Sequence, residues 1–366
     1  MGRIAGISAI VATVTRIGLD LAKNIFQVHG VDARGEVVLE RKLRRDRVIE
    51  FFGRLSPCVV AMEACGSAHY WGRELATLGH EVKLIPPAHV KPYVRRNKTD
   101  AADAAAICEA AMRPGQRFVA VRSQDNQAET MRHRVREQLT TQRTALLNAL
   151  RSHLSEIGVV APQGAQHAYR LKAMLSDGAD ENGEIRVSDT VRAALSPLAL
   201  QIDALDKAID AIDEELLAAA KADAKARQLM TIPGIGPVIA TAILATVRDV
   251  EAFASGREFA AFLGLTPRQC STGGKERLGG VSKMGDRYLR KLLVVGATSA
   301  LHHAQGHNDA LRCWIKTMLK RKAGLKYAYK LTAVALANKL ARIAFAILRS
   351  GESYDDRPVA AQAQPA

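Results

Sequence analysis

The stretch that decides the fold begins at residue 16 and holds three short segments: RIGLD (16–20), IFQVH (25–29) and EVVL (36–39). Apolar and polar residues tend to alternate in them, and a period of two is typical of β-strands. Gly30 and the sequence DARG (32–35) supply the residues that tight turns prefer. We therefore expect three short strands that pair antiparallel in chain order.

Helices and strands alternate after these three segments. The pattern predicts a polar helix at 45–55, a buried strand at 58–62, a helix at 67–78, a strand at 81–85 and an Ala-rich helix at 99–112. The resulting order, β-β-β-α-β-α-β-α, is that of an RNase H-like domain, in which helices flank a mixed sheet. We expect this α/β domain to span residues 14–122.

The rest of the chain is predicted to be helical. Residues 123–228 are expected to form a helical arm and linker, 229–350 a mainly α C-terminal domain, and 351–366 a disordered tail. Two long helices are predicted in this arm, at 124–157 and 190–228. Near-heptad spacing in the second favours an antiparallel coiled coil of the two that could self-associate. Its apolar positions are Leu198, Ile202, Leu205, Ile209, Ile212 and Leu216.

The charge balance indicates a polyanionic partner. The chain has 52 Lys and Arg against 37 Asp and Glu, a net charge of +15. Residues 251–350 alone hold 18 basic and 5 acidic side chains. Such a concentrated excess is typical of a nucleic-acid-binding surface, with an anionic membrane surface as the competing interpretation.

The cysteines and apolar segments bear on location. Five scattered cysteines without a Cys-x-x-Cys pair predict neither a disulfide framework nor a zinc site, which favours a reducing cytoplasm. The N-terminal apolar stretch is too short and too diluted for a secretory signal. No segment approaches the ~20 apolar residues that span a bilayer. We expect a cytoplasmic, nucleoid-associated protein without a membrane partner.

Four acidic residues stand where the predicted strands and helices place them close together. Asp20 ends the first strand, Glu63 follows the buried strand, and Asp100 and Asp103 lie on one face at the start of a helix. Together they would form an oxygen-rich pocket suited to Mg²⁺ or Mn²⁺, and two such ions can cleave a phosphodiester. The basic residues just before Asp100 would meet the phosphate backbone; they are Arg95, Arg96 and Lys98.

Each acid also has a purely structural interpretation. Asp20 can end a strand at a turn, Asp100 can cap a helix, and Asp103 can stabilise its first turn. Glu63 fits such an interpretation less well, because an apolar strand runs directly into it. All four together, in RNase H order, favour a catalytic metal site.

Three motifs carry a specific resemblance: GLDLAK (18–23), MEACG (62–66) and NKTDAADA (97–104). They resemble the acidic motifs of the DEDD-type insertion-sequence transposases, the "one-ten" family, whose N-terminal domain is RuvC-like. The resemblance implies that Asp20, Glu63, Asp100 and Asp103 bind the catalytic metal ion.

The sequence IPGIGP (232–237) has the form of a helix-hairpin-helix turn. Gly234 and Gly236 would let backbone N–H groups approach a DNA phosphate without reading bases. An ordinary turn between two helices explains the same residues equally well, because a Gly-x-Gly signal is weak.

A Gly-rich basic block follows at 264–287. Its composition describes a mobile loop beside phosphate that can present a hydroxyl to phosphorus, or a solvated loop that only binds the backbone. The sequence STGGK (271–275) is similar to the "eleven-eleven" branch of the same family, where a loop serine attacks DNA. This resemblance implies Ser271 as nucleophile, with Thr272 as the alternative in register. The basic residues expected to contact nucleic acid here are Arg268, Lys275, Arg277, Lys283 and Arg287.

Together with the acidic residues, the resemblance implies a site-specific DNA transposase of an insertion sequence that cuts and rejoins DNA through a phosphoserine intermediate, assisted by Mg²⁺ or Mn²⁺. The resemblance also implies a guide RNA encoded by the element, and we expect a homo-oligomer, a dimer or tetramer, acting on element ends and target DNA. Two alternatives stay open. One is an RNase H-fold nuclease or Holliday-junction resolvase that uses water as nucleophile, and the other is a non-catalytic nucleic-acid-binding protein.

Overall fold

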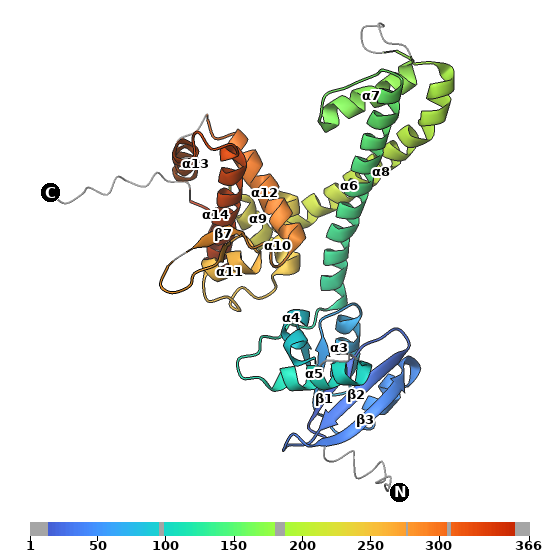
Figure 1. Ribbon diagram of the computed structural model, residues 1–366, viewed down its shortest axis with the longest axis vertical. Helices are drawn as coiled ribbons and strands as arrows, with labels where there is room; N and C mark the ends of the chain where they lie inside the picture. Colours follow the sequence, from blue (N-terminus) through green and yellow to red (C-terminus); the bar gives the residue numbers. More distant parts are fainter. Residues whose placement is uncertain (1–13, 95–98, 180–186, 276, 306–308, 356–366) are drawn as a thin grey trace, which may run out of the picture. The chain divides into compact units, whose positions relative to one another are not determined.

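A computed structural model describes residues 14–94, 99–179, 187–275, 277–305 and 309–355. The chain divides into two units, the first ending at Ala128 and the second beginning at Glu129 (Figure 1). Each unit has hydrophobic clusters of its own. The two are described separately.

The first unit is built on a five-stranded mixed sheet. Its strands are β1 (Arg16–Asp20), β2 (Ile25–Val31), β3 (Val37–Arg44), β4 (Val59–Glu63) and β5 (Glu81–Ile85). Their spatial order is β3-β2-β1-β4-β5, with β2 antiparallel to β1 and β3, and β4 parallel to β1 and β5. The expected antiparallel trio is confirmed, and β1 lies at the centre. This mixed α/β arrangement is consistent with an RNase H-like domain.

Helices cover both faces of this sheet. They are η1 (Arg45–Arg47), α2 (Val48–Phe52), α3 (Ala68–Thr77), α4 (Pro87–Val90), η2 (Lys91–Tyr93) and α5 (Asp100–Met112). Ile17 and Leu19 of β1 are fully buried in a cluster with Trp71 of α3. On the other face, Ala61 packs with Ile107 of α5. Because side chains alternate along a strand, Gly18 and Asp20 lie on the face that α5 covers.

Two long helices follow along the chain: α6 (Gln124–Glu156), whose residues from Glu129 onward belong to the second unit, and α8 (Asp189–Ala222), which lies wholly in that unit. Ion pairs join them in antiparallel order, Arg132 with Glu215, Arg136 with Asp213 and Arg143 with Asp206. The shorter α7 (Ala165–Asp177) packs against both through a cluster of buried apolar side chains (Figure 1). The two helices are thus antiparallel, and their assignment as a coiled-coil arm stays a prediction. Its self-association stays a prediction.

The C-terminal part of the second unit is a helical core with one small hairpin. Its elements are α9 (Ala224–Met230), α10 (Pro237–Thr246), α11 (Gly256–Phe262), β6 (Pro267–Gln269), β7 (Leu278–Val281), α12 (Arg287–His302), α13 (Ala310–Arg321) and α14 (Ala328–Ser350). Buried side chains from the helices form one continuous cluster. The strands β6 and β7 pair antiparallel within the Gly-rich block, so part of the expected loop is an ordered hairpin.

The last helix, α14, needs comment because it is long and apolar. By length and composition its 23 residues are enough to cross a membrane, which corrects the expectation that no segment reaches that size. Half of its most apolar window is buried. Leu336, Leu340 and Ala344 are fully buried in the core that also contains α11 and α12. We therefore assign α14 as the central helix of this core.

The start of the C-terminal tail is anchored. The Gln228 side chain donates a hydrogen bond to the Gly351 carbonyl oxygen, and the Tyr354 N–H donates to the Thr231 hydroxyl oxygen at 2.8 Å. The segment expected to be disordered therefore does not begin before residue 356. Residues 356–366, where the rest of that expectation falls, lie outside the described residues.

Candidate functional site

Gly18 lies in the middle of β1, where α5 packs directly on the strand. A Cβ atom added at Gly18 would come within 2.1 Å of the Ala104 carbonyl oxygen and 2.6 Å of the Cys108 backbone nitrogen. Real Cβ atoms essentially never come closer than 3.0 Å to another heavy atom. A residue without a side chain is therefore what lets α5 approach the backbone of β1.

This close approach brings three acids together. Asp20 lies two residues after Gly18 on the same face of β1. Thr99 caps α5, and Asp100 and Asp103 occupy its first turn, where the helix dipole favours negative charge. Carboxylate oxygens of Asp20, Asp100 and Asp103 lie within 4.8 Å of one another.

The chemistry of this group fits a hard divalent cation. All the ligand atoms are carboxylate oxygens, which Mg²⁺ and Mn²⁺ prefer over softer donors. Asp20 and Asp103 are half-buried, whereas Asp100 is exposed. Asp20 and Asp103 are therefore held in place by their surroundings, and Asp100 leaves the site open to solvent. A nucleic-acid strand would need such an opening to reach the carboxylates.

Glu63, the fourth predicted ligand, ends the neighbouring strand β4. The register pairs Leu19 with Met62, so Asp20 and Glu63 are the next residues of adjacent parallel strands. Partial burial raises the pKa of the Cys65 thiol, and the negative charges of Glu63 and Asp20 raise it further. The carboxylates of Glu63 and Asp20 therefore both lie close enough to Cys65 to influence its thiol. Glu63 lies beside the group of three and is not a member of it within 4.8 Å.

The basic residues predicted to lead DNA into this site fall outside the described part of the chain. Arg95, Arg96 and Lys98 all lie in the undescribed segment 95–98. Their contact with nucleic acid stays a prediction.

Ser271 and Thr272 lie in the connection between β6 and β7. The Cys270 N–H donates to the Arg277 carbonyl oxygen at 2.8 Å, and the Arg277 N–H donates to the Ser271 hydroxyl oxygen at 3.1 Å. Thr272 forms a bridge with Lys275, closed by Gly273 and Gly274. Ser271 and Thr272 are both exposed. In the bond from Arg277 the Ser271 hydroxyl oxygen is the acceptor, so this bond does not use the hydroxyl proton.

The base of this hairpin is held by two glycines. Gly264 and Gly285 adopt φ values of +69° and +93°. A Cβ atom at Gly264 would come within 1.7 Å of the Met284 carbonyl oxygen, and one at Gly285 within 1.8 Å of the Phe262 carbonyl oxygen. Backbone packing at these positions fixes where the hairpin leaves the core. Its predicted nucleic-acid ligands are all exposed: Arg268, Lys275, Arg277, Lys283 and Arg287.

The turn at 232–237 joins α9 to α10, and its two glycines differ. Gly234 has φ +90°, and a Cβ atom there would come within 2.5 Å of the Gly296 carbonyl oxygen of α12. This glycine is therefore required for helix packing. Nothing lies within 4 Å of a Cβ atom at Gly236. Only Gly236 has the open surroundings that the hairpin interpretation needs, and phosphate binding at either residue stays a prediction.

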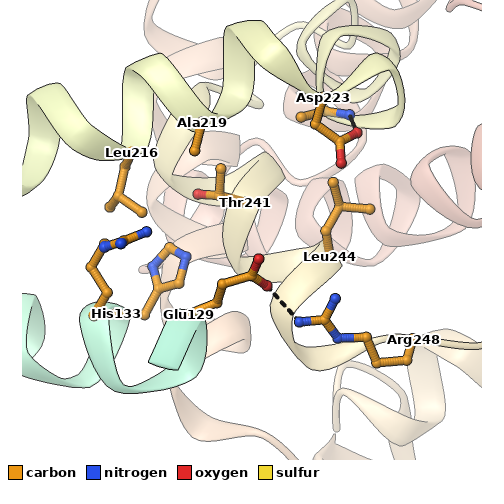
Figure 2. Close-up of a pocket in the computed structure, with 10 residues that line it drawn as sticks. Glu129, His133, Leu216, Ala219, Asp223, Thr241, Leu244 and Arg248 are labelled. Atoms are coloured by element: carbon orange, nitrogen blue, oxygen red, sulfur yellow. Dashed lines mark hydrogen bonds and ion pairs between the residues drawn. The ribbon is translucent and has the colours of Figure 1, made fainter. Parts of the chain in front are cut away.

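A polar pocket between α6, α8 and α10 has no counterpart among the motifs of the sequence. This cavity of about 110 Å³ is lined by His133 and Glu129, which forms an ion pair with Arg248 (Figure 2). His133 is buried, and its Nδ1 atom lies 3.3 Å from the Tyr288 hydroxyl oxygen. Burial lowers the pKa of His133 to about 4 and raises the pKa of Tyr288 to about 12. Both side chains are therefore neutral at pH 7.

Comparison with known families gives two matches. Residues 17–159 match a DEDD-type transposase family, and residues 226–311 match the family described as "Transposase IS116/IS110/IS902 family". The first of these domains indicates use of a divalent metal ion.

Curated relatives extend over nearly the whole chain. The chain is 45% identical to the "Probable family 20 transposase" of Pseudomonas aeruginosa, over 93% of this chain and 98% of that one. It is 38% identical to the transposase of insertion sequence element IS1328 of Yersinia enterocolitica, over 93% and 98%. Identity is also 38% to the transposase of element IS1111A of Coxiella burnetii, over 92% and 90%.

Proposed function

Since this chain belongs to the IS116/IS110/IS902 family of insertion-sequence transposases, and is therefore a DNA transposase, we propose that it cuts and rejoins DNA through a covalent bond to Ser271, assisted by Mg²⁺ or Mn²⁺ at its carboxylate cluster. The observation that carries the metal site is the convergence of Asp20, Asp100 and Asp103 from distant parts of the sequence.

In this proposal Asp20, Asp100 and Asp103 hold the ion, and Glu63 completes the set from the adjacent strand. A divalent cation bound there supplies positive charge that favours ionisation of a nearby hydroxyl and offsets the charge that develops on phosphate. The four carboxylates supply the geometry: two come from neighbouring strands and two from one helix turn packed on them.

Ser271 is the nucleophile of the proposal. Its Oγ atom forms a bond to phosphorus and gives up its proton, while the bond from phosphorus to the leaving deoxyribose oxygen breaks and that oxygen takes a proton. One phosphoester replaces another, so rejoining by the reverse reaction needs no external energy. The hydrogen bond from Arg277 to the Ser271 oxygen supports this choice over Thr272, because it orients the hydroxyl.

The carboxylates belong to the first unit and Ser271 to the second. We propose that they act on one phosphate in an assembled dimer or tetramer on element and target DNA. A guide RNA encoded by the element would select that DNA, and the basic C-terminal region offers charge for such a partner. The protein would then work in the cytoplasm, on the nucleoid.

The test is to trap covalent protein–DNA adducts on DNA that carries the element's end, with Mg²⁺ present. The parent protein and Thr272→Val are expected to form adducts that survive denaturation, and Ser271→Ala and Asp20→Asn are expected to form none. Equal adduct in the parent and Ser271→Ala would rule out the assignment. Cutting without any adduct in the parent would instead support a nuclease that uses water.

A further inference from the structure

The strand register places a row of polar side chains beside the carboxylate cluster. Asp20 of β1 pairs with Gln27 of β2, and Gln27 pairs with Lys42 of β3. Residues that lie directly opposite in antiparallel strands project to the same face. The three side chains therefore lie on the face that α5 covers. Neighbouring strands are about 4.8 Å apart, so Lys42 begins roughly 10 Å from Asp20 along the row.

A cavity of about 230 Å³ lies along this row. Its lining includes Gln27 and His29 from β2, Glu40 and Lys42 from β3, and Ala101 from the first turn of α5. Since Ala101 directly follows Asp100, the cavity adjoins the carboxylate cluster. The cavity and the cluster both belong to the first unit.

Gln27 is the feature that points to a ligand. The residue is 6% exposed, yet its side-chain amide forms no hydrogen bond with any other residue in the described part of the chain. The side chain lines the cavity, and its amide is not one of the side-chain polar groups that are sealed from solvent without a partner. An amide left without a protein partner in the wall of a cavity is therefore available to a bound molecule.

The charges in this cavity favour an anion at its Lys42 end. The Lys42 ammonium is exposed and forms no ion pair among the described residues. The acid that lines the same cavity, Glu40, lies 3.2 Å from the His29 Nδ1 atom. His29 and Glu40 are themselves opposite in register, two pairs further along the strands and on the same face. The Gln27–Lys42 pair thus offers N–H donors that neighbouring side chains do not occupy.

We propose that this cavity is a second phosphate subsite, in which Gln27 and Lys42 donate hydrogen bonds to a backbone phosphate of the DNA strand held at the carboxylate cluster. The inference rests on the proposed function and adds to it. The roughly 10 Å between Lys42 and Asp20 places this phosphate close along the strand to the one that is cut. Contacts of this kind fix the register of a strand and do not read its sequence.

The experiment measures binding of the full-length protein to short labelled single strands of mixed sequence, one DNA and one RNA, by fluorescence anisotropy over a salt series with Mn²⁺ present. Lys42→Ala is expected to weaken DNA binding about tenfold and to reduce the slope of log affinity against log salt by about 0.7. Gln27→Met, which keeps the side-chain length and loses the amide, is expected to weaken binding without changing the slope. Arg34→Ala is the matched control, because Arg34 is exposed in the turn between β2 and β3.

The subsite is overturned if the slope of log affinity against log salt concentration is the same for Lys42→Ala as for Arg34→Ala and the parent. A change with RNA alone overturns the assignment to a DNA strand. Lys42 is exposed, so its variant carries the test even if Gln27→Met fails to fold. Calorimetry with Mn²⁺ separates the two proposals: Asp20→Asn should lose Mn²⁺ binding and Lys42→Ala should keep it. Mn²⁺ binding that survives Asp20→Asn contradicts the proposed function, whereas a missing Lys42 effect with Asp20 behaving as expected contradicts the subsite alone.

Discussion

Replacement of Gly18 by alanine is expected to damage the metal site without touching any of its ligands. The added Cβ atom would meet the Ala104 carbonyl oxygen at 2.1 Å and the Cys108 Cβ atom at 2.8 Å. The first contact is with the backbone of α5 and cannot be relieved by a side-chain rotation. The helix must therefore move away from β1.

The size of this movement follows from the contact distance. Real Cβ atoms essentially never come closer than 3.0 Å to another heavy atom, so α5 must shift by at least about 1 Å at Ala104, one residue after Asp103. Overpacking of this kind costs about 1–3 kcal/mol of stability. Because Asp20 stays on the strand while Asp103 moves with the helix, we expect Mn²⁺ affinity to fall by about 10- to 100-fold, as for changes that misplace metal ligands.

Calorimetric titration with Mn²⁺ and urea unfolding measure the two effects of Gly18→Ala. Gly66→Ala is the matched control, because no atom lies within 4 Å of a Cβ atom at Gly66. The control is expected to bind Mn²⁺ and unfold as the parent does. If Gly18→Ala also matches the parent in both measurements, α5 does not pack on β1 as described, and the argument for the cluster fails.

Three further predictions concern the second unit. The pKa of His133 is about 4 in the folded protein, against an ordinary value of 6.5. As the pH falls, the unfolded chain therefore takes up a proton at this histidine before the folded protein does. The free energy of unfolding keeps its full value above pH 6.5 and decreases by roughly 3 kcal/mol as the pH falls to about 4. His133→Gln should flatten this decline in urea unfolding, and an unchanged profile contradicts the burial of a neutral imidazole. Arg136→Met leaves the Asp213 carboxylate without its partner and should lower the free energy of unfolding by about 1 kcal/mol, since both groups are partly exposed. A double-mutant cycle with Asp213→Leu should show coupling between the two positions, and additive effects would exclude a stabilising ion pair. Gly234→Ala should cost about 2–3 kcal/mol because of its positive φ and the nearby Gly296 carbonyl oxygen, whereas Gly236→Ala should cost less; equal melting temperatures would contradict this difference.

The sheet and its acids could be predicted because their signals are local. Each strand shows its period of two within a few residues, and Asp20 and Glu63 stand at strand ends that the element order makes neighbours. The capped start of α5 is likewise visible in Thr99 and Asp100. The local pattern could not provide the role of Gly18. A glycine in a strand marks either a β-bulge or a position where another backbone segment packs closely on the strand. The path of α5, which the local sequence does not determine, shows that Gly18 is the second case.

The Gly-rich block contains a local signal for a hairpin at Gly273 and Gly274. Gly273 and Gly274 have φ values of +57° and +77°, as a two-residue hairpin turn requires. A Gly-Gly pair between short segments predicts such a hairpin. The abundance of glycine and basic residues in the block favours a mobile loop, and the structure shows that the Gly-Gly signal decides the local fold.

The pocket around His133 could not have been found from the sequence. His133 and Tyr288 are 155 residues apart, and each sits in a helix whose local pattern explains it as an ordinary residue. The same holds for Gln27, which looks like an exposed strand position until α5 covers that face of the sheet. Burial of polar groups by distant segments is decided by tertiary packing and not by local propensity.

The most direct test of the metal site is the anomalous scattering of Mn²⁺ in crystals of the full-length protein. We predict a peak at about 2.0–2.6 Å from carboxylate oxygens of Asp20, Asp100 and Asp103, lost in the Asp20→Asn variant. Saturating Mn²⁺ without a peak at these residues would contradict the account.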